Sequence, residues 1–234
     1  MPAGDEYAAE KRFTTQRRED RMRTAILSLA LLLGVASAGR AQETCIDQIK
    51  FPAVGRWAEY QALYNKKDPS TIRYAVVGGE RRAGKDLKWL ELRMKGEKKD
   101  RNIVYQMLVP GSAAELGDVQ EIVMKSGEKP AMKMDGMMLN MIRSQMERQS
   151  FLSDVCKDVA LVGPESVTVP AGKFQTRHFR SDKYTSDSWL SRDIPFAMVK
   201  SVGKNYEMAL LSYGDGAKSS ITEVPQSMGG RREK

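Results

Sequence analysis

The stretch VTVPAGKFQTRHFR, Val167 to Arg180, carries the clearest structural signal in the chain. Pro170 suits the second position of a tight turn because its ring fixes φ, and Gly172 suits the fourth position. The flanking segments contain β-branched and aromatic side chains, which favour extended backbone. This stretch therefore predicts two antiparallel strands joined by a tight hairpin.

Similar runs continue along most of the chain. Each is short, contains β-branched or aromatic residues, and is bounded by turn-forming residues. They are residues 56–64, 71–77, 88–95, 102–109, 119–125, 131–134, 188–191, 198–202 and 206–213. No helical pattern alternates with them, which favours antiparallel pairing. We therefore predict a mainly β (α+β) fold: a curved antiparallel sheet, or incomplete β-barrel, with one amphipathic helix packed on its concave face.

The segment GERRAGKD, Gly79 to Asp86, fits the spacing of a phosphate-binding loop. However, Asp86 stands where that loop needs a hydroxyl, and the residues that follow read as a strand rather than a helix. A charged hairpin loop is the better prediction.

The one helix is expected at residues 136–149, inside the methionine-rich stretch MKMDGMMLNMIRSQMERQ, Met132 to Gln149. On a helical wheel, one side is apolar. Its residues are Met137, Met138, Leu139, Met141, Ile142 and Met146. Asp135 is a suitable N-cap. Because methionine is flexible and polarizable, a helix of this kind laid over a curved sheet could act as a soft lid on an apolar cavity.

The N-terminal region predicts a secretory signal peptide. The apolar run AILSLALLLGV, Ala25 to Val35, follows a positively charged flank and precedes the small residues ASAGRA. The run is shorter than the roughly 20 residues that a membrane span needs. Cleavage fits after Ala38 or Ala41, and we favour Ala41.

These signals divide the chain into three parts. Residues 1–41 are a polar lead-in plus signal peptide, with translation starting at Met1 or Met22. Residues 42–224 form a single antiparallel β domain, and residues 225–234 are a polar tail that we expect to be disordered. The mature chain is expected to be periplasmic or secreted, with no transmembrane span after signal removal.

Export changes the interpretation of the two cysteines. Both Cys45 and Cys156 remain after cleavage, and an even number in an oxidising compartment favours one disulfide. The alternative is two buried free thiols. The C-x-x-C spacing of a redox catalyst is absent from the sequence.

The charge pattern restricts the partners. The chain has a net charge of +8, of which residues 1–41 contribute +2. The remaining charges are interspersed, as on a solvated surface or one that anionic lipid attracts. We expect no nucleic-acid partner, because export removes it and no basic helix with interleaved aromatic residues occurs.

No catalytic or metal-binding pattern emerges. Local motifs of serine hydrolases, zinc proteases and zinc deaminases are absent from the sequence, and His178 is the single histidine. Met134, Met137, Met138 and Met141 have helical spacing that could hold Cu(I). The same spacing describes any buried helix face, so we expect no cofactor and no metal, and retain copper handling as the weakest alternative.

Two segments resemble a known group of proteins. VTVPAGKFQTRHF, Val167 to Phe179, and DSWLSRDIPFAMVKS, Asp187 to Ser201, resemble a signature of uncharacterised bacterial cell-envelope families, which look like relatives of the outer-membrane lipoprotein carrier fold. GRWAEYQ, Gly55 to Gln61, resembles the opening of such domains. The resemblance implies a strongly curved antiparallel sheet with helix on its concave side. The sequence departs from the pattern at Phe196-Ala197-Met198, where such proteins often carry glycine.

The leading hypothesis is a non-catalytic binding or carrier module for an apolar ligand, namely a lipid or the acyl chain of a lipoprotein. The expected ligand-binding residues are Met134, Met137, Met138, Met141, Ile142, Trp57, Tyr60 and Trp189. The alternative is a structural or protein-interaction module that contacts other envelope proteins and has no ligand cavity.

Overall fold

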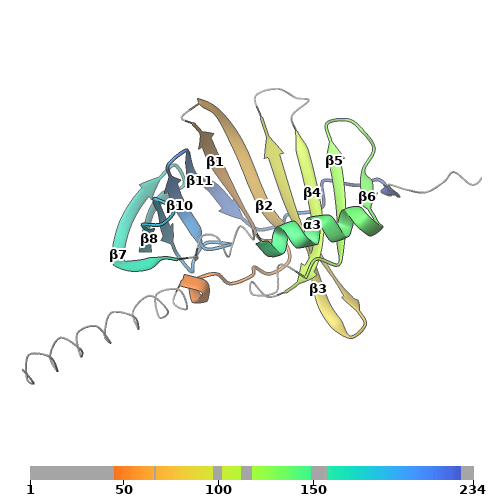
Figure 1. The fold of residues 1–234 in the computed structure, drawn as a ribbon, viewed down its shortest axis with the longest axis horizontal. Helices are drawn as coiled ribbons and strands as arrows, with labels where there is room; N and C mark the ends of the chain where they lie inside the picture. Colours follow the sequence, from red (N-terminus) through yellow and green to blue (C-terminus); the bar gives the residue numbers. More distant parts are fainter. Residues whose placement is uncertain are drawn as a thin grey trace, which may run out of the picture. The chain divides into compact units, whose positions relative to one another are not determined.

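The computed structural model describes residues 45–65, 67–96, 102–111, 118–148, 156 and 158–227, although inside α3 only some side chains are described. The predicted signal peptide and its cleavage site lie outside these residues. The strands form one sheet in the order β12-β6-β5-β4-β3-β2-β1-β11-β10-β9-β8-β7 (Figure 1). The elements are β1 (Trp57–Tyr64), β2 (Lys67–Arg82), β3 (Lys85–Lys95), β4 (Ile103–Pro110), β5 (Glu121–Ser126), β6 (Met132–Met134), α3 (Gly136–Arg148), β7 (Ala160–Val169), β8 (Gly172–Ser181), β9 (Ser186–Leu190), β10 (Met198–Gly203), β11 (Tyr206–Gly214) and β12 (Gln226–Ser227).

Tight turns produce this order. The β7–β8 hairpin closes at Val169 and Gly172, so Pro170 and Ala171 form the predicted two-residue turn. The β2–β3 hairpin closes at Arg82 and Lys85. Its turn is a two-residue loop in which Ala83 and Gly84 both have positive φ, as expected for a hairpin that matches the twist of its strands. GERRAGKD is therefore a charged hairpin, as predicted.

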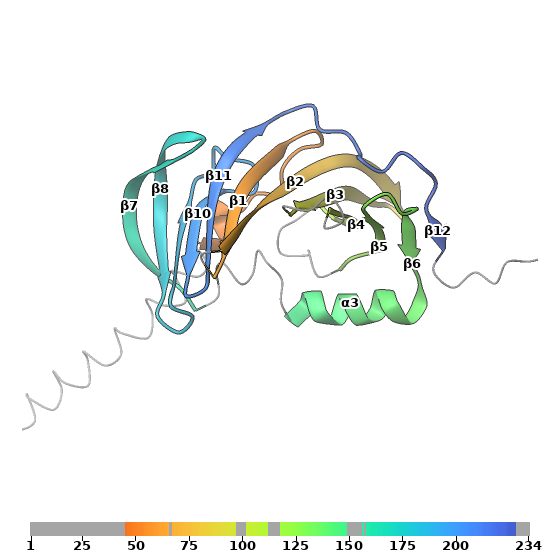
Figure 2. The same cartoon turned by 90° about the horizontal axis from the view of Figure 1, so that it is seen from above.

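The sheet is curved and open, and α3 lies on its concave side (Figure 2). Among the described strands, the terminal strands β12 and β7 do not pair with each other. The predicted mainly β fold with a curved antiparallel sheet is confirmed. One pair, β12 with β6, is parallel. The Gln226 amide donates a hydrogen bond to the Ala131 carbonyl, so the sheet includes residues beyond position 224.

The C-terminal segment between β11 and β12 covers part of the convex face. The side-chain amide of Gln106 donates to the Ser219 hydroxyl at 2.6 Å, and the Ser220 amide donates to the Glu91 carboxylate at 2.9 Å. Ile221 packs with Val123 and a neighbouring alanine in a small apolar cluster. These contacts lie on the face of the sheet opposite to α3.

A disulfide joins Cys45 and Cys156, the pairing expected from the sequence, with Cα atoms 5.5 Å apart. Cys45 opens a single helical turn at residues 45–48, ahead of β1, while Cys156 lies between α3 and β7. Both cysteines are fully buried. The bond therefore ties the segment before the first strand to the connection that follows the helix.

An ion-pair cluster around the half-buried Glu121 of β5 gives the fold a pH dependence. Arg82 and Lys133 each hold the Glu121 carboxylate at 3.0 Å. Burial acts to raise the pKa of Glu121, but hydrogen bonds from the two cations outweigh it and leave that pKa below its usual 4.5. A carboxyl group with a lowered folded-state pKa stabilises the fold above its unfolded pKa and loses that contribution as pH falls through the folded value.

Glu121→Gln is therefore expected to lower the free energy of unfolding at pH 7 by about 1–2 kcal/mol. The difference from the native chain should shrink as the pH falls below 4.5. Urea unfolding at pH 7 and at about pH 3 checks both points. Glu128→Gln, at an exposed turn position, is the control and should leave stability unchanged at either pH. A difference between Glu121→Gln and the native chain that is independent of pH would contradict the assignment.

Candidate ligand-binding face

Apolar residues form three parallel rows across the concave face of β1–β6, because directly opposed residues in antiparallel strands share a face. The deep row is Val76, Leu90, Met107, Ile122 and Met134. The middle row is Ala58, Tyr74, Leu92, Tyr105, Met124 and Met132. The outer row is Tyr60, Ile72, Met94 and Ile103, and ends at Ser126. The alternation of Leu90, Leu92 and Met94 in the sequence reflects these rows.

The side chains of the three rows differ in their exposure to solvent. Every residue of the deep row is buried. In the middle row only Ala58 is buried, and the side chains from Tyr74 to Met132 are half-buried. In the outer row Tyr60 and Ile72 are buried, whereas Met94 and Ile103 are half-buried. The concave face of β3–β6 thus carries a contiguous apolar surface that is partly open, and such surfaces mark interaction or ligand sites.

Leu139 and Arg143 provide contacts between the helix α3 and the rest of the fold. Leu139 packs against the main apolar cluster, which includes the buried Val119. Arg143 follows Leu139 by four residues and therefore lies on the same side of the helix. Its guanidinium donates hydrogen bonds to the Val119 carbonyl and, at 3.4 Å, to the Gln120 carbonyl. Leu139 and Arg143 therefore anchor the helix.

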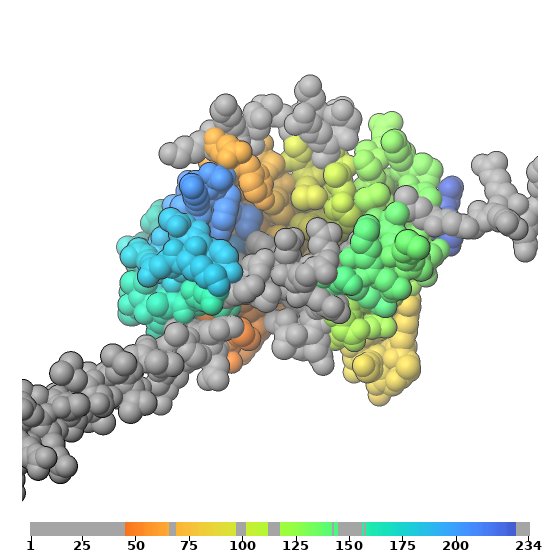
Figure 3. Space-filling view, viewed as in Figure 1, coloured from red at the N-terminus to blue at the C-terminus, as the bar shows by residue number. Residues whose placement is uncertain are grey.

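The methionines of α3 are not on the anchoring side. Met137 and Met141 are each two residues from Leu139, so they project roughly 160° away from it around the helix axis. They are 88% and 60% exposed, and Met138, on the flank, is 36% exposed. Figure 3 shows α3, in green, forming part of the molecular surface on this side. The sequence-based expectation that the whole apolar side packs is therefore corrected: the apolar arc is too wide to face one sheet.

Two tyrosines lie where the rows begin. Tyr60 is fully buried, and within the described part of the chain its hydroxyl has no hydrogen-bond partner. Burial raises the pKa of Tyr60 well above its usual value, and neighbouring Tyr74 raises it further. Burial likewise raises the pKa of Tyr74, whose ring centre lies 6.0 Å from that of Tyr60.

The structure brings together only part of the predicted site. Tyr60 and Met134 lie on the concave face, in the outer and deep rows. Ile142 lies in α3, but its side chain is outside the described set. Trp57 and Trp189 lie on the opposite face of the sheet. Trp57 pairs with Ala75, which lies between Tyr74 and Val76 of the concave rows. Trp189 is connected through paired residues of β10 and β11 to Gln61, the neighbour of Tyr60. Sequence spacing carried this signal for Trp57: it is three residues from Tyr60, and in a strand such residues face opposite ways.

On that opposite face, His178 forms a cluster that sequence reasoning missed. Its Nδ1 lies 2.9 Å from the Glu165 carboxylate and its Nε2 lies 2.7 Å from the Asp187 carboxylate. The Trp189 ring stacks on the imidazole at 4.5 Å. Only 7% of the His178 side chain is exposed, so the imidazole is buried within this cluster.

The partners of His178 define its role. Burial acts to raise the pKa of Asp187, but hydrogen bonds from His178 and Arg180 outweigh it and hold the pKa below its usual value. Both imidazole nitrogens lie within ion-pair distance of a carboxylate. The cluster binds β7, β8 and β9 together, and its geometry is structural.

The described residues contain no group of three or more His, Cys, Asp or Glu side chains arranged to hold a metal ion. Met134 faces the core while Met137 and Met141 project away from it, so the structure does not gather the four thioethers considered for Cu(I). Among the described helices, none is long and apolar enough to cross a membrane.

No protein-family model and no curated protein sequence matches the chain. Solved structures align with it, among them two proteins from bacteria of the genera Bacteroides and Parabacteroides. A protein from Bacteroides fragilis, assigned as exported and with a YmcC-like fold, aligns over 71% of this chain and 99% of its own, at 11% identity and a TM-score of 0.38. A protein from Parabacteroides distasonis, assigned as a lipoprotein, aligns over 71% and 98%, at 12% identity and a TM-score of 0.34.

Proposed function

We propose that the chain is an exported, non-catalytic binding or carrier module whose concave face holds an acyl chain of a lipid or lipoprotein. The observation that carries this proposal is that apolar side chains of the middle and outer rows are only half-buried, whereas the whole deep row is buried. Leu92, Tyr105 and Met124 lie side by side in consecutive strands and are all half-buried. Leaving them open to water is unfavourable by about 25 cal/mol for each Å² of apolar surface.

The dimensions favour an acyl chain as the occupant. The half-buried part of the middle row runs from β2 to β6, and at about 4.8 Å between strands it extends for about 19 Å. An acyl chain spans one half of a bilayer hydrocarbon core that is about 30 Å thick. The lipoprotein-carrier resemblance of the two sequence segments adds to this proposal.

A titration with a fluorescent polyene fatty acid tests the proposal. We expect saturable binding with one fatty acid per chain, and displacement by a non-fluorescent long-chain acid but not by a short-chain acid. Binding that does not saturate, or that short-chain acids displace equally well, would contradict it.

A second candidate function is a protein-interaction module of the cell envelope. The outward projection of Met137 and Met141 favours it, because exposed methionines adapt to irregular partner surfaces. In that case the outward methionines, and not the concave rows, would carry binding.

A further inference from the structure

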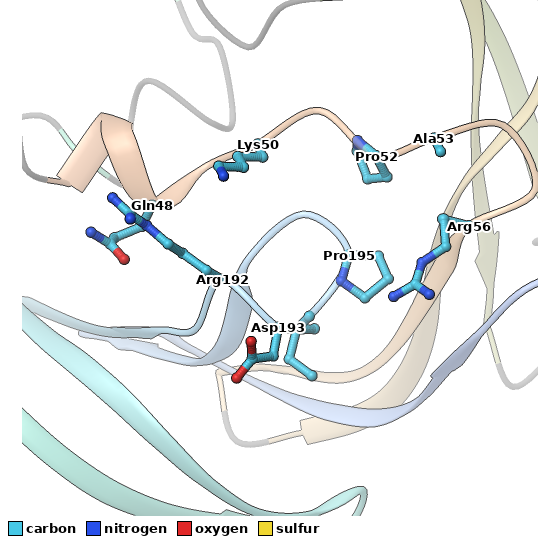
Figure 4. A pocket seen from close by; sticks show the side chains of 9 residues that line it. Gln48, Lys50, Pro52, Ala53, Arg56, Arg192, Asp193 and Pro195 are labelled. Carbon is cyan, nitrogen blue, oxygen red and sulfur yellow. The ribbon is translucent and has the colours of Figure 1, made fainter.

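A pocket lies between the segment that precedes β1 and the loop that joins β9 to β10 (Figure 4). Its volume is about 190 Å³. The lining residues are Gln48, Lys50, Pro52, Ala53, Arg56, Arg192, Asp193, Ile194 and Pro195. This is below the roughly 300–1,000 Å³ of pockets for drug-sized ligands, so the pocket fits a smaller molecule.

The loop wall of the pocket is held in an unusual backbone conformation. Phe196 and Ala197, which follow the lining residues, have φ of 64° and 62°. This left-handed region costs non-glycine residues of order 1–3 kcal/mol each, and such outliers cluster at functional sites. The loop is fixed by hydrogen bonds from the Ala197 amide to the Ile194 carbonyl at 2.9 Å and from the Ser191 amide to the Ala197 carbonyl at 2.7 Å.

Aromatic contacts join the two walls. The Phe196 ring from the loop packs edge-on against Phe51 of the opposite segment, with ring centres 6.3 Å apart. Phe196 also contacts Tyr74 of the sheet, at 5.7 Å. The pocket is therefore built by packed elements on both sides rather than by two independent loops.

The charges of the pocket are not balanced. Arg56 pairs with Asp215 at 3.1 Å. Among the described side chains, no carboxylate lies within ion-pair distance of Lys50 or Arg192. Figure 4 shows Lys50 and Arg192 extending toward the same end of the pocket, beside Gln48, while the Asp193 carboxylate is turned away from them. That end of the pocket is positive.

We propose that this pocket binds the phosphate group of a small organic phosphate, either free or as the head group of a lipid. Lysine and arginine are the side chains that bind phosphate best, by point charge and by paired N–H donors respectively. The volume leaves room beside the phosphate for a short organic group. The site is separate from the concave rows, so it can be tested independently of acyl-chain binding.

Two experiments test the proposal. The first is calorimetric titration with glycerol 3-phosphate, with glycerol as the neutral control. The second is co-sedimentation of the chain with vesicles that contain phosphatidylglycerol. We expect saturable binding of the phosphate and none of glycerol. Lys50→Ala with Arg192→Ala should weaken binding by at least about tenfold. Lys173→Ala with Arg177→Ala removes the same two kinds of charge from exposed positions outside the pocket and should leave binding unchanged.

The outcomes separate the two sources of phosphate. Binding of glycerol 3-phosphate in solution assigns the pocket to free organic phosphates, and binding only to vesicles assigns it to lipid head groups. Failure of the native chain to bind either probe would overturn the proposal. Equal weakening in both double variants would also overturn it, because general positive charge would then explain the binding.

Discussion

Replacing Cys45 and Cys156 by alanine is expected to lower the free energy of unfolding by about 4–5 kcal/mol. The two residues are separated by 111 positions, and in the chain-entropy model a loop of this length restricts the unfolded chain strongly. A loss of this size is comparable with the whole stability of many domains, about 5–15 kcal/mol. Urea unfolding of the double variant against the oxidised native chain measures it.

Reduction of the native chain is the matched control for the alanine variant. It removes the same crosslink and keeps both sulfur atoms, so it should cost a similar free energy. A loss below about 1 kcal/mol in both experiments would contradict the entropic account. It would indicate that the unfolded chain is already compact around this link.

Met94→Asp with Met124→Asp is expected to weaken acyl-chain binding by about a hundredfold or more. Both methionines lie half-buried on the concave face, so each substitution removes apolar contact and places a carboxylate that the ligand would have to desolvate. Fluorescent fatty-acid titration measures the change, and thermal unfolding verifies that the variant is folded.

Met137→Asp with Met141→Asp is the matched control, because it makes the same chemical change on the outward side of α3. We expect acyl-chain binding to be retained in this variant. If the outward pair abolished binding and the concave pair did not, the assignment of the ligand to the concave face would be wrong. Loss of binding to an envelope protein only in the outward pair would favour the interaction-module alternative.

Most of the sheet could be predicted from sequence, because hairpin chemistry is local. Pro170 and Gly172 define one turn, and the strand runs between turn residues match the observed strands within a few positions. The first half of β7 was missed because Gly163 and Pro164 resemble a break. Both are tolerated there since β7 is an edge strand with a bulge at Gly163. Phe196 and Ala197 have positive φ, the backbone conformation that glycine adopts most easily, although neither residue is glycine.

The candidate site was less predictable, because it depends on which face each element presents. The helix wheel identified an apolar arc correctly but could not show that Leu139 would face the sheet and Met137 the solvent. Arg143 decides the orientation by bonding to backbone carbonyls, a contact that no helical period reveals. Similarly, the carboxylate partners of His178 come from β7 and β9, and only the register of the folded sheet brings them to one imidazole.

Native mass spectrometry of the chain, expressed with its N-terminal region and purified without detergent, tests acyl-chain binding most directly. We predict a mass excess that denaturation releases as a lipid, and that disappears in Met94→Asp with Met124→Asp but persists in Met137→Asp with Met141→Asp. A bare mass for the native chain, unchanged after incubation with lipid, would contradict the account and leave the concave rows without a ligand.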